Sequence, residues 1–274
     1  MKRIFFLLAL LSSMVMKLSA QTYEELCERA MTAAEQDSLQ QAEEYIRGAL
    51  KLDPANERNA LLFSNLGTIQ RRQRLYEDAL QSYDLALNYA PKSVPILLNR
   101  ATLFMEMGKD EAAKGDYALV LDVEPDNAEA LLMRAYIYMQ ERNYAFARAD
   151  YEHLLKVDAK HYSARLGLAM LCQREMKQQE ALVLLNALLQ DYPSDDVLLV
   201  ARAGVENDLN QIDAAVIDLD KAIAINPSQV DAYLIRGQIY LAQKRKKQAR
   251  EDFESAMKLG VPYANLRDLL QKCK

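Results

Sequence analysis

The sequence repeats with a period of 34 residues, and this period restricts the possible folds more than any other feature of the chain. One grid of 34-residue steps carries four prolines and, at its middle point, an alanine: Pro91, Pro125, Ala159, Pro193 and Pro227. Pro54 lies 37 residues before Pro91, so three residues near 57–59 are an insertion. In this frame the chain contains seven units, at 23–56, 60–93, 94–127, 128–161, 162–195, 196–229 and 230–263.

Several positions of the unit keep one kind of side chain. Position 20 is always alanine: Ala42, Ala79, Ala113, Ala147, Ala181, Ala215 and Ala249. Position 8 is always small: Ala30, Gly67, Ala101, Ala135, Ala169, Ala203 and Gly237. Position 24 is always large and apolar or aromatic: Ile46, Tyr83, Tyr117, Tyr151, Leu185, Leu219 and Phe253. Position 4 is apolar in every unit except the fifth, which has Arg165.

Each unit contains two apolar stripes at helical spacing, separated by a polar break such as Met107-Gly108-Lys109. This pattern predicts a helical hairpin, in which the small residues let the two helices approach and the large residues fill the space beside them. The proline near position 32 ends the second helix, because it lacks a backbone N–H and restricts the residue before it. One hairpin cannot bury both of its faces, so we expect the units to stack.

The pattern resembles the tetratricopeptide repeat, a 34-residue helix-turn-helix unit with small residues at positions 8 and 20 and proline at position 32. The resemblance covers Tyr23 to about Tyr263, with Ala159 and Val261 in place of proline as departures. It implies an all-α, right-handed superhelical solenoid of about seven hairpins, forming a single domain over residues 21–274. The segment 264–273 continues an apolar face through Leu266, Leu269 and Leu270, and we expect it to be a helix that caps the last hairpin.

Arginine at position 7 and aspartate at position 23 occur together in four units: Arg100 with Asp116, Arg134 with Asp150, Arg202 with Asp218, and Arg236 with Asp252. Units two and five lack both residues, and only the first unit has one without the other, with Arg29 opposite Tyr45. An unpaired buried charge is costly, which explains the joint presence or absence. A catalytic pair is needed once, so a pair repeated four times indicates structural ion pairs across each hairpin.

Residues 1–20 differ from the rest of the sequence. Lys2 and Arg3 precede the apolar run Ile4–Met16, which is too short to span a bilayer, and Ala20 provides a small residue before Gln21. This arrangement predicts a secretory signal peptide, with an uncleaved anchor as the alternative, and the remaining sequence has no apolar run long enough to cross a membrane. We expect an exported protein, in the periplasm or cell envelope of a Gram-negative bacterium, and a secreted eukaryotic protein is the alternative origin.

Removal of residues 1–20 leaves 31 basic residues (34 minus Lys2, Arg3 and Lys17) and 39 acidic ones, a net charge of −8. Such an acidic chain is a poor candidate for binding nucleic acid by charge. The three cysteines are widely spaced and form no disulfide framework. We expect Cys27 and Cys172 to be buried, whereas the place of Cys273 at the tail leaves its exposure open.

The sequence contains no signature of catalysis or of a cofactor site. His153 and His161 are the only histidines, and neither has cysteine or carboxylate neighbours at metal-ligand spacing. There is no glycine-rich phosphate loop, no Gly-x-Ser-x-Gly motif and no Cys/His dyad in a recognisable frame. We therefore expect no enzyme activity, no cofactor and no metal.

The resemblance implies that the first helices of the units line a concave groove in which partners bind, at positions 2, 5, 6, 9 and 12. The residues at these positions that we expect to bind a partner are Leu98, Asn99, Thr102, Leu132, Met133, Tyr136, Met139, Leu166, Met170, Val200, Asn207, Leu234, Ile235 and Gln238. The middle of this surface is apolar and rich in methionine, which suits adaptable binding surfaces. Interhelical packing is the alternative role for any one of these residues.

Related chaperone-binding repeats clamp a terminal carboxylate with lysines at these positions, and this chain lacks those lysines. We expect an extended peptide or a helix in the groove instead. Two basic turns, 71–74 and 244–247, are either solvated loops or contacts for an anionic partner.

Three classes of function remain open. The leading hypothesis is a non-enzymatic adaptor that binds a protein or peptide partner. The second is a carrier or sensor of a small hydrophobic or glycan ligand in the same groove. The third is an enzyme of unrecognised type, which needs converging titratable groups that the groove positions do not supply.

Overall fold

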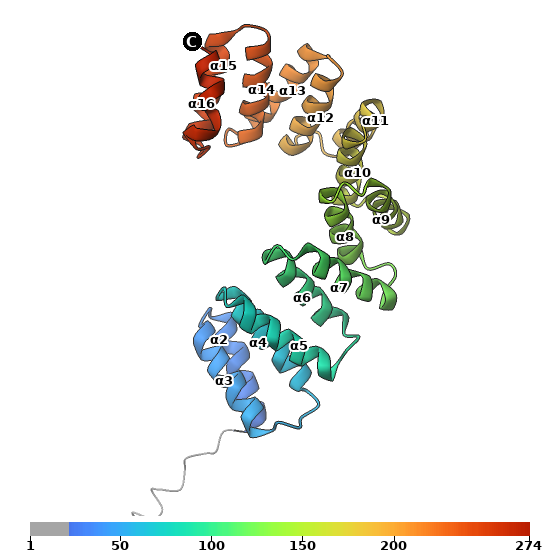
Figure 1. The fold of residues 1–274 in the computed structure, drawn as a ribbon, viewed down its shortest axis with the longest axis vertical. Coiled ribbons are helices and arrows are strands. Elements are labelled where there is room, and N and C mark those ends of the chain that lie inside the picture. The colour runs from blue at the N-terminus through green and yellow to red at the C-terminus, as the bar shows by residue number, and fades with distance from the viewer. Residues whose placement is uncertain (1–21) are drawn as a thin grey trace, which may run out of the picture. The chain divides into compact units, whose positions relative to one another are not determined.

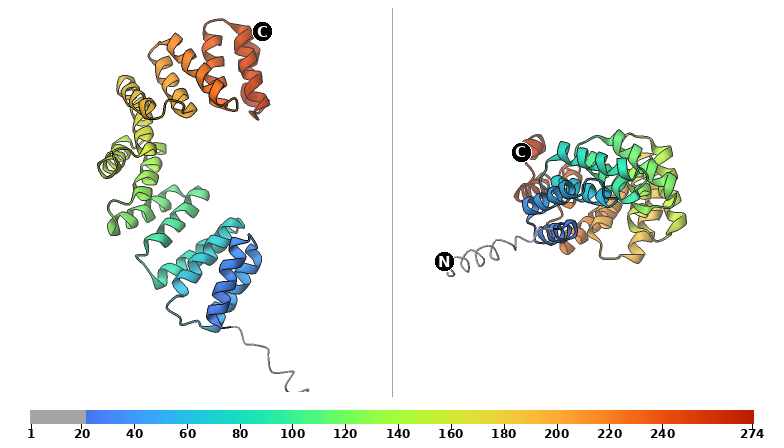
Figure 2. Two further views of the ribbon diagram at one scale, coloured as in Figure 1. Left: turned by 180° about the vertical axis from the view of Figure 1, so that it is seen from behind. Right: turned by 90° about the horizontal axis from the view of Figure 1, so that it is seen from below.

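The computed structural model describes residues 22–274, so the predicted signal peptide lies outside the described residues. Within that range the chain is all α-helical, with fifteen helices and no strand. The chain divides into two compact units, one that ends at Pro125 and one that runs from Asp126 to Lys274. Within each unit, consecutive helices lie side by side (Figures 1 and 2).

The first compact unit contains three helical hairpins: α2 (Tyr23–Glu35) with α3 (Leu39–Leu52), α4 (Asn59–Arg72) with α5 (Tyr76–Tyr89), and α6 (Val94–Glu106) with α7 (Asp110–Val123). The chain enters α2 through a capping box. Thr22 Oγ1 accepts a hydrogen bond from the Glu25 amide, and the Glu25 carboxylate accepts one from the Thr22 amide. These two bonds satisfy backbone donors that the first helical turn leaves free.

The second compact unit contains four more hairpins and a final helix: α8 (Ala128–Gln140) with α9 (Tyr144–Val157), α10 (Tyr162–Arg174) with α11 (Gln178–Asp191), α12 (Asp196–Asp208) with α13 (Ile212–Ile225), α14 (Val230–Ala242) with α15 (Lys246–Lys258), and α16 (Tyr263–Lys272). The last helix packs on α15 and buries Leu266. The expected all-α solenoid of hairpins with a terminal capping helix is therefore confirmed. Cys172 is buried as expected, whereas Cys27 is only half-buried. Cys273, whose place at the tail left exposure open, is buried at the end of α16 because its helix packs against the preceding hairpin.

All seven hairpins turn at the same point of the repeat. Position 15 has a positive φ in each, between 58° and 68°, at Asp37, Arg74, Gly108, Arg142, Met176, Asn210 and Lys244. Only one of these residues is glycine, so six side chains accept the left-handed conformation that commonly ends a helix. In the fourth hairpin the Asn143 amide donates to Tyr138 O at 2.8 Å, and the Arg142 amide donates to Met139 O at 3.2 Å. These bonds satisfy carbonyls at the end of α8.

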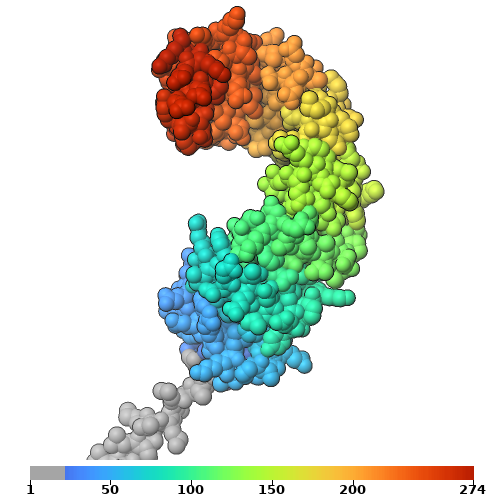
Figure 3. All heavy atoms as spheres, in the orientation of Figure 1, coloured from blue at the N-terminus to red at the C-terminus, as the bar shows by residue number. Residues whose placement is uncertain are grey.

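The two helices of each hairpin meet over the small residues. Every alanine at position 20 is completely buried, as is the aromatic ring of Tyr83, Tyr117 and Phe253 at position 24. A Cβ added to Gly67 would lie 2.8 Å from Tyr83 Cε1, and one added to Gly237 would lie 2.8 Å from Phe253 Cε1. The ring of one helix therefore occupies space that a side chain at position 8 of the other would need, which limits this position to glycine or alanine. Figure 3 shows the outer surface of the packed hairpins, with all heavy atoms as spheres.

The structure brings the four arginine and aspartate pairs together across their hairpins. In each, the guanidinium donates two hydrogen bonds to one carboxylate, as Arg134 does to Asp150 at 2.8 and 2.7 Å. The aspartates are buried, whereas the arginine side chains keep about a fifth of their surface exposed. The hydrogen bond to Asp116 raises the pKa of the Arg100 guanidinium above its usual value. This bidentate geometry is the strongest form of such a pair.

Three of these arginines also join neighbouring hairpins. Arg100 Nη1 donates to Asp84 Oδ1 at 2.7 Å, Arg202 Nη1 to Asn186 Oδ1 at 2.8 Å, and Arg236 Nη1 to Asp220 Oδ1 at 2.5 Å. The acceptor is always position 25 of the preceding unit. Each guanidinium thus links the two helices of its own hairpin to the second helix of the hairpin before it.

We expect Arg134→Leu to lower the free energy of unfolding by about 3 kcal/mol, because the substitution leaves the buried Asp150 carboxylate without this partner. Replacing Asp150 with leucine as well should restore most of the loss. Urea unfolding of the single and double variants, followed by circular dichroism, measures both effects. Equal stability of the two variants would contradict the structural role of the pair.

Candidate functional site

A cavity of about 570 Å³ lies between α8 and α10, the first helices of two neighbouring hairpins in the second compact unit. Six residues predicted to bind a partner line it together: Leu132, Met133, Tyr136 and Met139 from α8, and Leu166 and Met170 from α10. Its other lining residues are Gln140, Arg142, Tyr144, Tyr151, Ser163, Gly167 and Arg174. None of these thirteen residues is acidic.

The apolar lining of this cavity is open to solvent along both helices. Tyr136 exposes 46% of its surface and Met170 exposes 47%. Met133 and Met139 are half-buried beside them. Exposed apolar residues gathered around a cavity, rather than scattered singly, are typical of a binding surface.

Tyr151 forms the floor of the cavity although it belongs to the second helix α9. Its ring fits against α10 because residue 167 is glycine, where a Cβ would come within 2.5 Å of Tyr151 Cζ. The side chain is only 4% exposed, and burial raises the pKa of its hydroxyl to about 12. Among the described residues, this hydroxyl has no hydrogen-bond partner, and its oxygen remains accessible to solvent in the cavity. The equivalent Tyr83 hydroxyl lies 3.0 Å from Thr68 Oγ1 and is hydrogen-bonded to it.

Two arginines lie at the edge of the same cavity. Arg142 is the turn residue between α8 and α9, and Arg174 is the last residue of α10. Both are exposed, and neither guanidinium makes a hydrogen bond or ion pair within residues 22–274. Arg174 was not among the predicted groove residues, because it lies at position 13, one residue beyond the last groove position. Its spacing of four residues from Met170 is the signal that places it on the same helix face.

The remaining predicted groove residues do not meet at this cavity. Leu98, Asn99 and Thr102 lie on α6, where Thr102 Oγ1 donates to Leu98 O at 2.9 Å. Val200 is buried in the core of the second compact unit, and Ile235 packs partly against that core. Leu234 is half-buried, whereas Asn207 and Gln238 are exposed. The cavity therefore gathers the middle of the predicted set and leaves out both ends.

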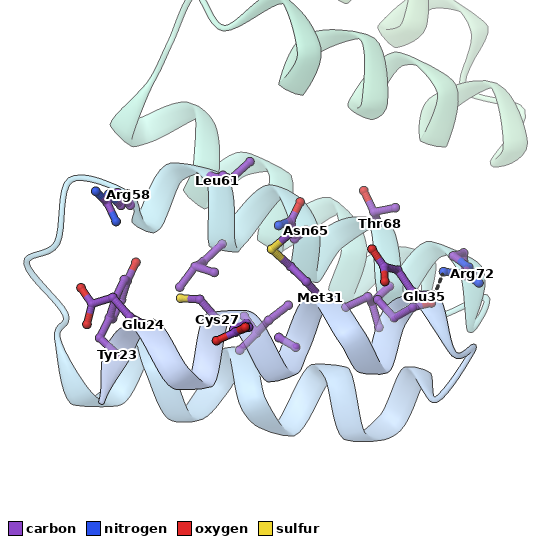
Figure 4. Close-up of a pocket in the computed structure, with 16 residues that line it drawn as sticks. Tyr23, Glu24, Cys27, Met31, Glu35, Arg58, Leu61, Asn65, Thr68 and Arg72 are labelled. Atoms are coloured by element: carbon purple, nitrogen blue, oxygen red, sulfur yellow. Dashed lines mark hydrogen bonds between the residues drawn. The ribbon is translucent and has the colours of Figure 1, made fainter. Parts of the chain in front are cut away.

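A second cavity, of about 610 Å³, lies between α2 and α4 in the first compact unit (Figure 4). Met31 and Leu61 face it and are 60% and 63% exposed. Arg58 and Arg72 lie at its opposite ends (Figure 4). This surface was not predicted from the sequence, because the predicted groove residues begin in the third unit. The methionine and leucine at positions 9 and 2 of the first two units were the available signal.

The α2/α4 cavity carries both signs of charge. Its lining includes three carboxylates, Glu24, Glu28 and Glu35, and the two arginines. Arg72 is engaged by the hairpin turn, since Nη2 donates to Asp37 Oδ1 at 2.8 Å. Burial raises the pKa of the Cys27 thiol, which also lines this cavity. A mixed rim of this kind does not select one sign of ligand charge.

The described part of the chain contains no group of three or more His, Cys, Asp and Glu residues able to hold a metal ion. His153 Nε2 lies 2.8 Å from Asp126 Oδ1, and His161 Nδ1 accepts a hydrogen bond from the Ala164 amide at the start of α10. Both histidines thus have structural contacts. From residue 22 onward, none of the helices has the length and apolar character that a membrane crossing requires.

The basic turns make contacts within the protein. Arg71 Nη1 lies 3.3 Å from Glu106 Oε1, and the Arg245 guanidinium lies over the Tyr240 ring at 4.1 Å from its centroid. Arg245 also donates to Gln248 Oε1 at 2.7 Å. These contacts give the turns a structural role, and their binding of an anionic partner stays a prediction.

The tetratricopeptide repeat model matches residues 27–94, 98–149, 132–196 and 206–260. A crystal structure of a tetratricopeptide repeat protein from Parabacteroides merdae is similar at 36% identity and a TM-score of 0.79, over 93% of this chain and 99% of that one. No curated protein matches the chain.

Two more distant structures share the fold alone. The hetero-tetramer Cut9-Hcn1 of APC/C is 14% identical, with a TM-score of 0.64, over 95% of this chain and 57% of that one. The pilF protein of Pseudomonas aeruginosa is 16% identical, with a TM-score of 0.63, over 79% of this chain and 97% of that one.

The raised pKa of Tyr151 predicts a loss of stability in alkali. The neutral hydroxyl is favoured in the folded state, so its contribution is complete below the unfolded value of 10.0 and is lost as the pH rises through about 12. Tyr151→Phe should therefore unfold with a weaker pH dependence above pH 10. Urea unfolding of both proteins from pH 9 upward tests this, and identical pH profiles would contradict it.

Proposed function

This chain belongs to the tetratricopeptide repeat family, whose members generally act as scaffolds for protein–protein interaction, and from this premise we propose that it is a non-enzymatic adaptor that binds a peptide or a helix of a partner on its first helices. One observation carries the proposal. Six predicted groove residues from two helices line a single cavity with a solvent-exposed apolar rim. Such a surface buries apolar side chains of a partner at little cost in rearrangement.

A carrier or sensor of a small hydrophobic or glycan ligand is the second candidate. A volume of about 570 Å³ lies within the range of small-molecule sites, and the cavity combines apolar walls with a few polar groups. The exposed rim favours the adaptor, because a peptide or helix that lies along α8 and α10 covers both Tyr136 and Met170.

We also propose that the protein is exported to the periplasm or cell envelope of a Gram-negative bacterium. The tripartite pattern of residues 1–20 supports export. The similar protein from Parabacteroides merdae supports a bacterial origin.

We expect affinity capture with residues 21–274 from an envelope extract to retain a protein that a groove variant loses. The variant combines Met133→Glu, Tyr136→Ala and Met170→Glu, which place charge and a void where the apolar rim lies. Circular dichroism establishes that the variant keeps its helices. Retention of the same protein by both chains would place binding elsewhere, and no retention by either would favour the small-ligand carrier.

We expect the full-length chain, expressed in a Gram-negative host, to lose residues 1–20 and appear in the periplasmic or envelope fraction. Intact mass and N-terminal sequencing should give Gln21 as the first residue. Replacing Leu7, Leu8 and Leu11 with aspartate should keep the chain in the cytoplasm, because the apolar run is then interrupted. An unprocessed chain in the cytoplasm would contradict export.

A further inference from the structure

We propose that the α8/α10 cavity recognises an acidic, apolar segment of a partner protein, with an apolar side chain inside the cavity and a neighbouring carboxylate held by Arg142, Arg174 and the Tyr151 hydroxyl. This inference rests on the proposed adaptor function and specifies the chemistry of its partner. It follows from three features of the cavity: a hydroxyl donor with no acceptor in the described chain, two unpaired cations and an exposed apolar rim.

The Tyr151 hydroxyl is a donor that faces the cavity without an acceptor from the described chain. The second and fourth units differ at position 9. Position 9 of the second unit is Thr68, whose hydroxyl bonds Tyr83, whereas position 9 of the fourth unit is Tyr136. A ligand oxygen at this point can accept a hydrogen bond that no described residue of the chain accepts.

Two arginines without an ion pair lie at this one cavity. Of the five arginines at position 7, four are paired with aspartate, and Arg148 and Arg165 are paired with Glu175 and Asp191. Arg142 and Arg174 have no such partner anywhere in the described residues, although the mature chain carries a net charge of −8. Since no acidic residue lines the cavity, its local charge is positive. That charge attracts a carboxylate and disfavours a basic segment.

The occupant is a protein segment rather than a free organic acid. Tyr136 on α8 and Met170 on α10 line the cavity, and each leaves almost half of its surface in water, so the apolar lining is open to solvent along both helices. A segment that continues along the two helices covers both, and the flexible methionines adapt to its side chains.

The α2/α4 cavity serves as an internal comparison. It has a similar volume and apolar residues that are even more exposed, yet three carboxylates and two arginines line it. A segment with apolar and charged residues, whether acidic or basic, therefore meets both attractive and repulsive charges in this cavity. The preference for acidic residues is expected from the α8/α10 cavity alone.

The test is selection of random 12-residue peptides, displayed on phage, against residues 21–274 in three forms. These are the wild type, the charge variant Arg142→Glu with Arg174→Glu, and the groove variant Met133→Glu, Tyr136→Ala and Met170→Glu. We expect wild-type pools enriched in Asp or Glu beside large apolar residues. The charge variant should lose this enrichment or select Lys and Arg instead.

A synthetic copy of the most enriched peptide then gives quantitative measurements by fluorescence anisotropy. Replacing its acidic residue with the amide should weaken binding about tenfold at low salt, since a charge-assisted hydrogen bond is lost. Tyr151→Phe should weaken binding about fivefold and leave the thermal midpoint at neutral pH unchanged. Tyr83→Phe, the matched control in the first compact unit, should leave peptide binding unchanged.

The outcomes separate the inference from the function on which it rests. Peptides that require the groove but carry no acidic residue, or that bind the charge variant equally, overturn the inference and leave the adaptor function standing. If no peptide depends on the groove, both are overturned. Charge-dependent binding of decanoate without any peptide binding would assign the cavity to small carboxylates, and dimerisation abolished in the charge variant would assign it to a second copy of the chain.

Discussion

The close approach of two helices at position 20 is the constraint on which the rest of the structure depends. A completely buried alanine in every hairpin lets the first helix lie against the second, and the ring or aliphatic side chain at position 24 fills the remaining space. Gly67 and Gly237 show how little room is left, because a single added carbon would overlap a buried ring. With the hairpin geometry set in this way, arginine at position 7 reaches aspartate at position 23 in the same form each time, and the groove positions of each first helix stay on one face.

The fold followed from the sequence because a repeat supplies the same evidence many times. The alternation of small and large residues, the prolines and the paired charges all recur at fixed positions, so each unit repeats the evidence of the others. The link from Arg100, Arg202 and Arg236 to the preceding hairpin was missed, since its acceptor is aspartate in two cases and asparagine in the third. Pattern analysis that looks for opposite charges overlooks a neutral acceptor.

The candidate site was predictable only in part. The apolar residues of α8 and α10 belong to fixed groove positions, which is why six of them meet at one cavity. Tyr151 could not be placed there from its position, because position 24 packs inside the hairpin in the other units. It reaches the cavity through Gly167 on the next hairpin, and contacts between hairpins have no signature in a single unit. Arg142 lies in the turn between α8 and α9, outside the groove positions of the first helices.

These departures from the repeat are where binding chemistry can be added to a scaffold. Thr68 completes the hydrogen bond of Tyr83, so the second unit keeps its hydroxyl for internal use. The fourth unit has Tyr136 at that position, and its Tyr151 hydroxyl is left to face the cavity. The same logic separates the paired arginines of position 7 from Arg174, since a cation with no acceptor in the described chain contributes nothing to folding through an ion pair. The hairpins otherwise repeat one packing arrangement. We therefore infer that polar groups without an internal partner, such as the Tyr151 hydroxyl and Arg174, give this surface its specificity for another molecule.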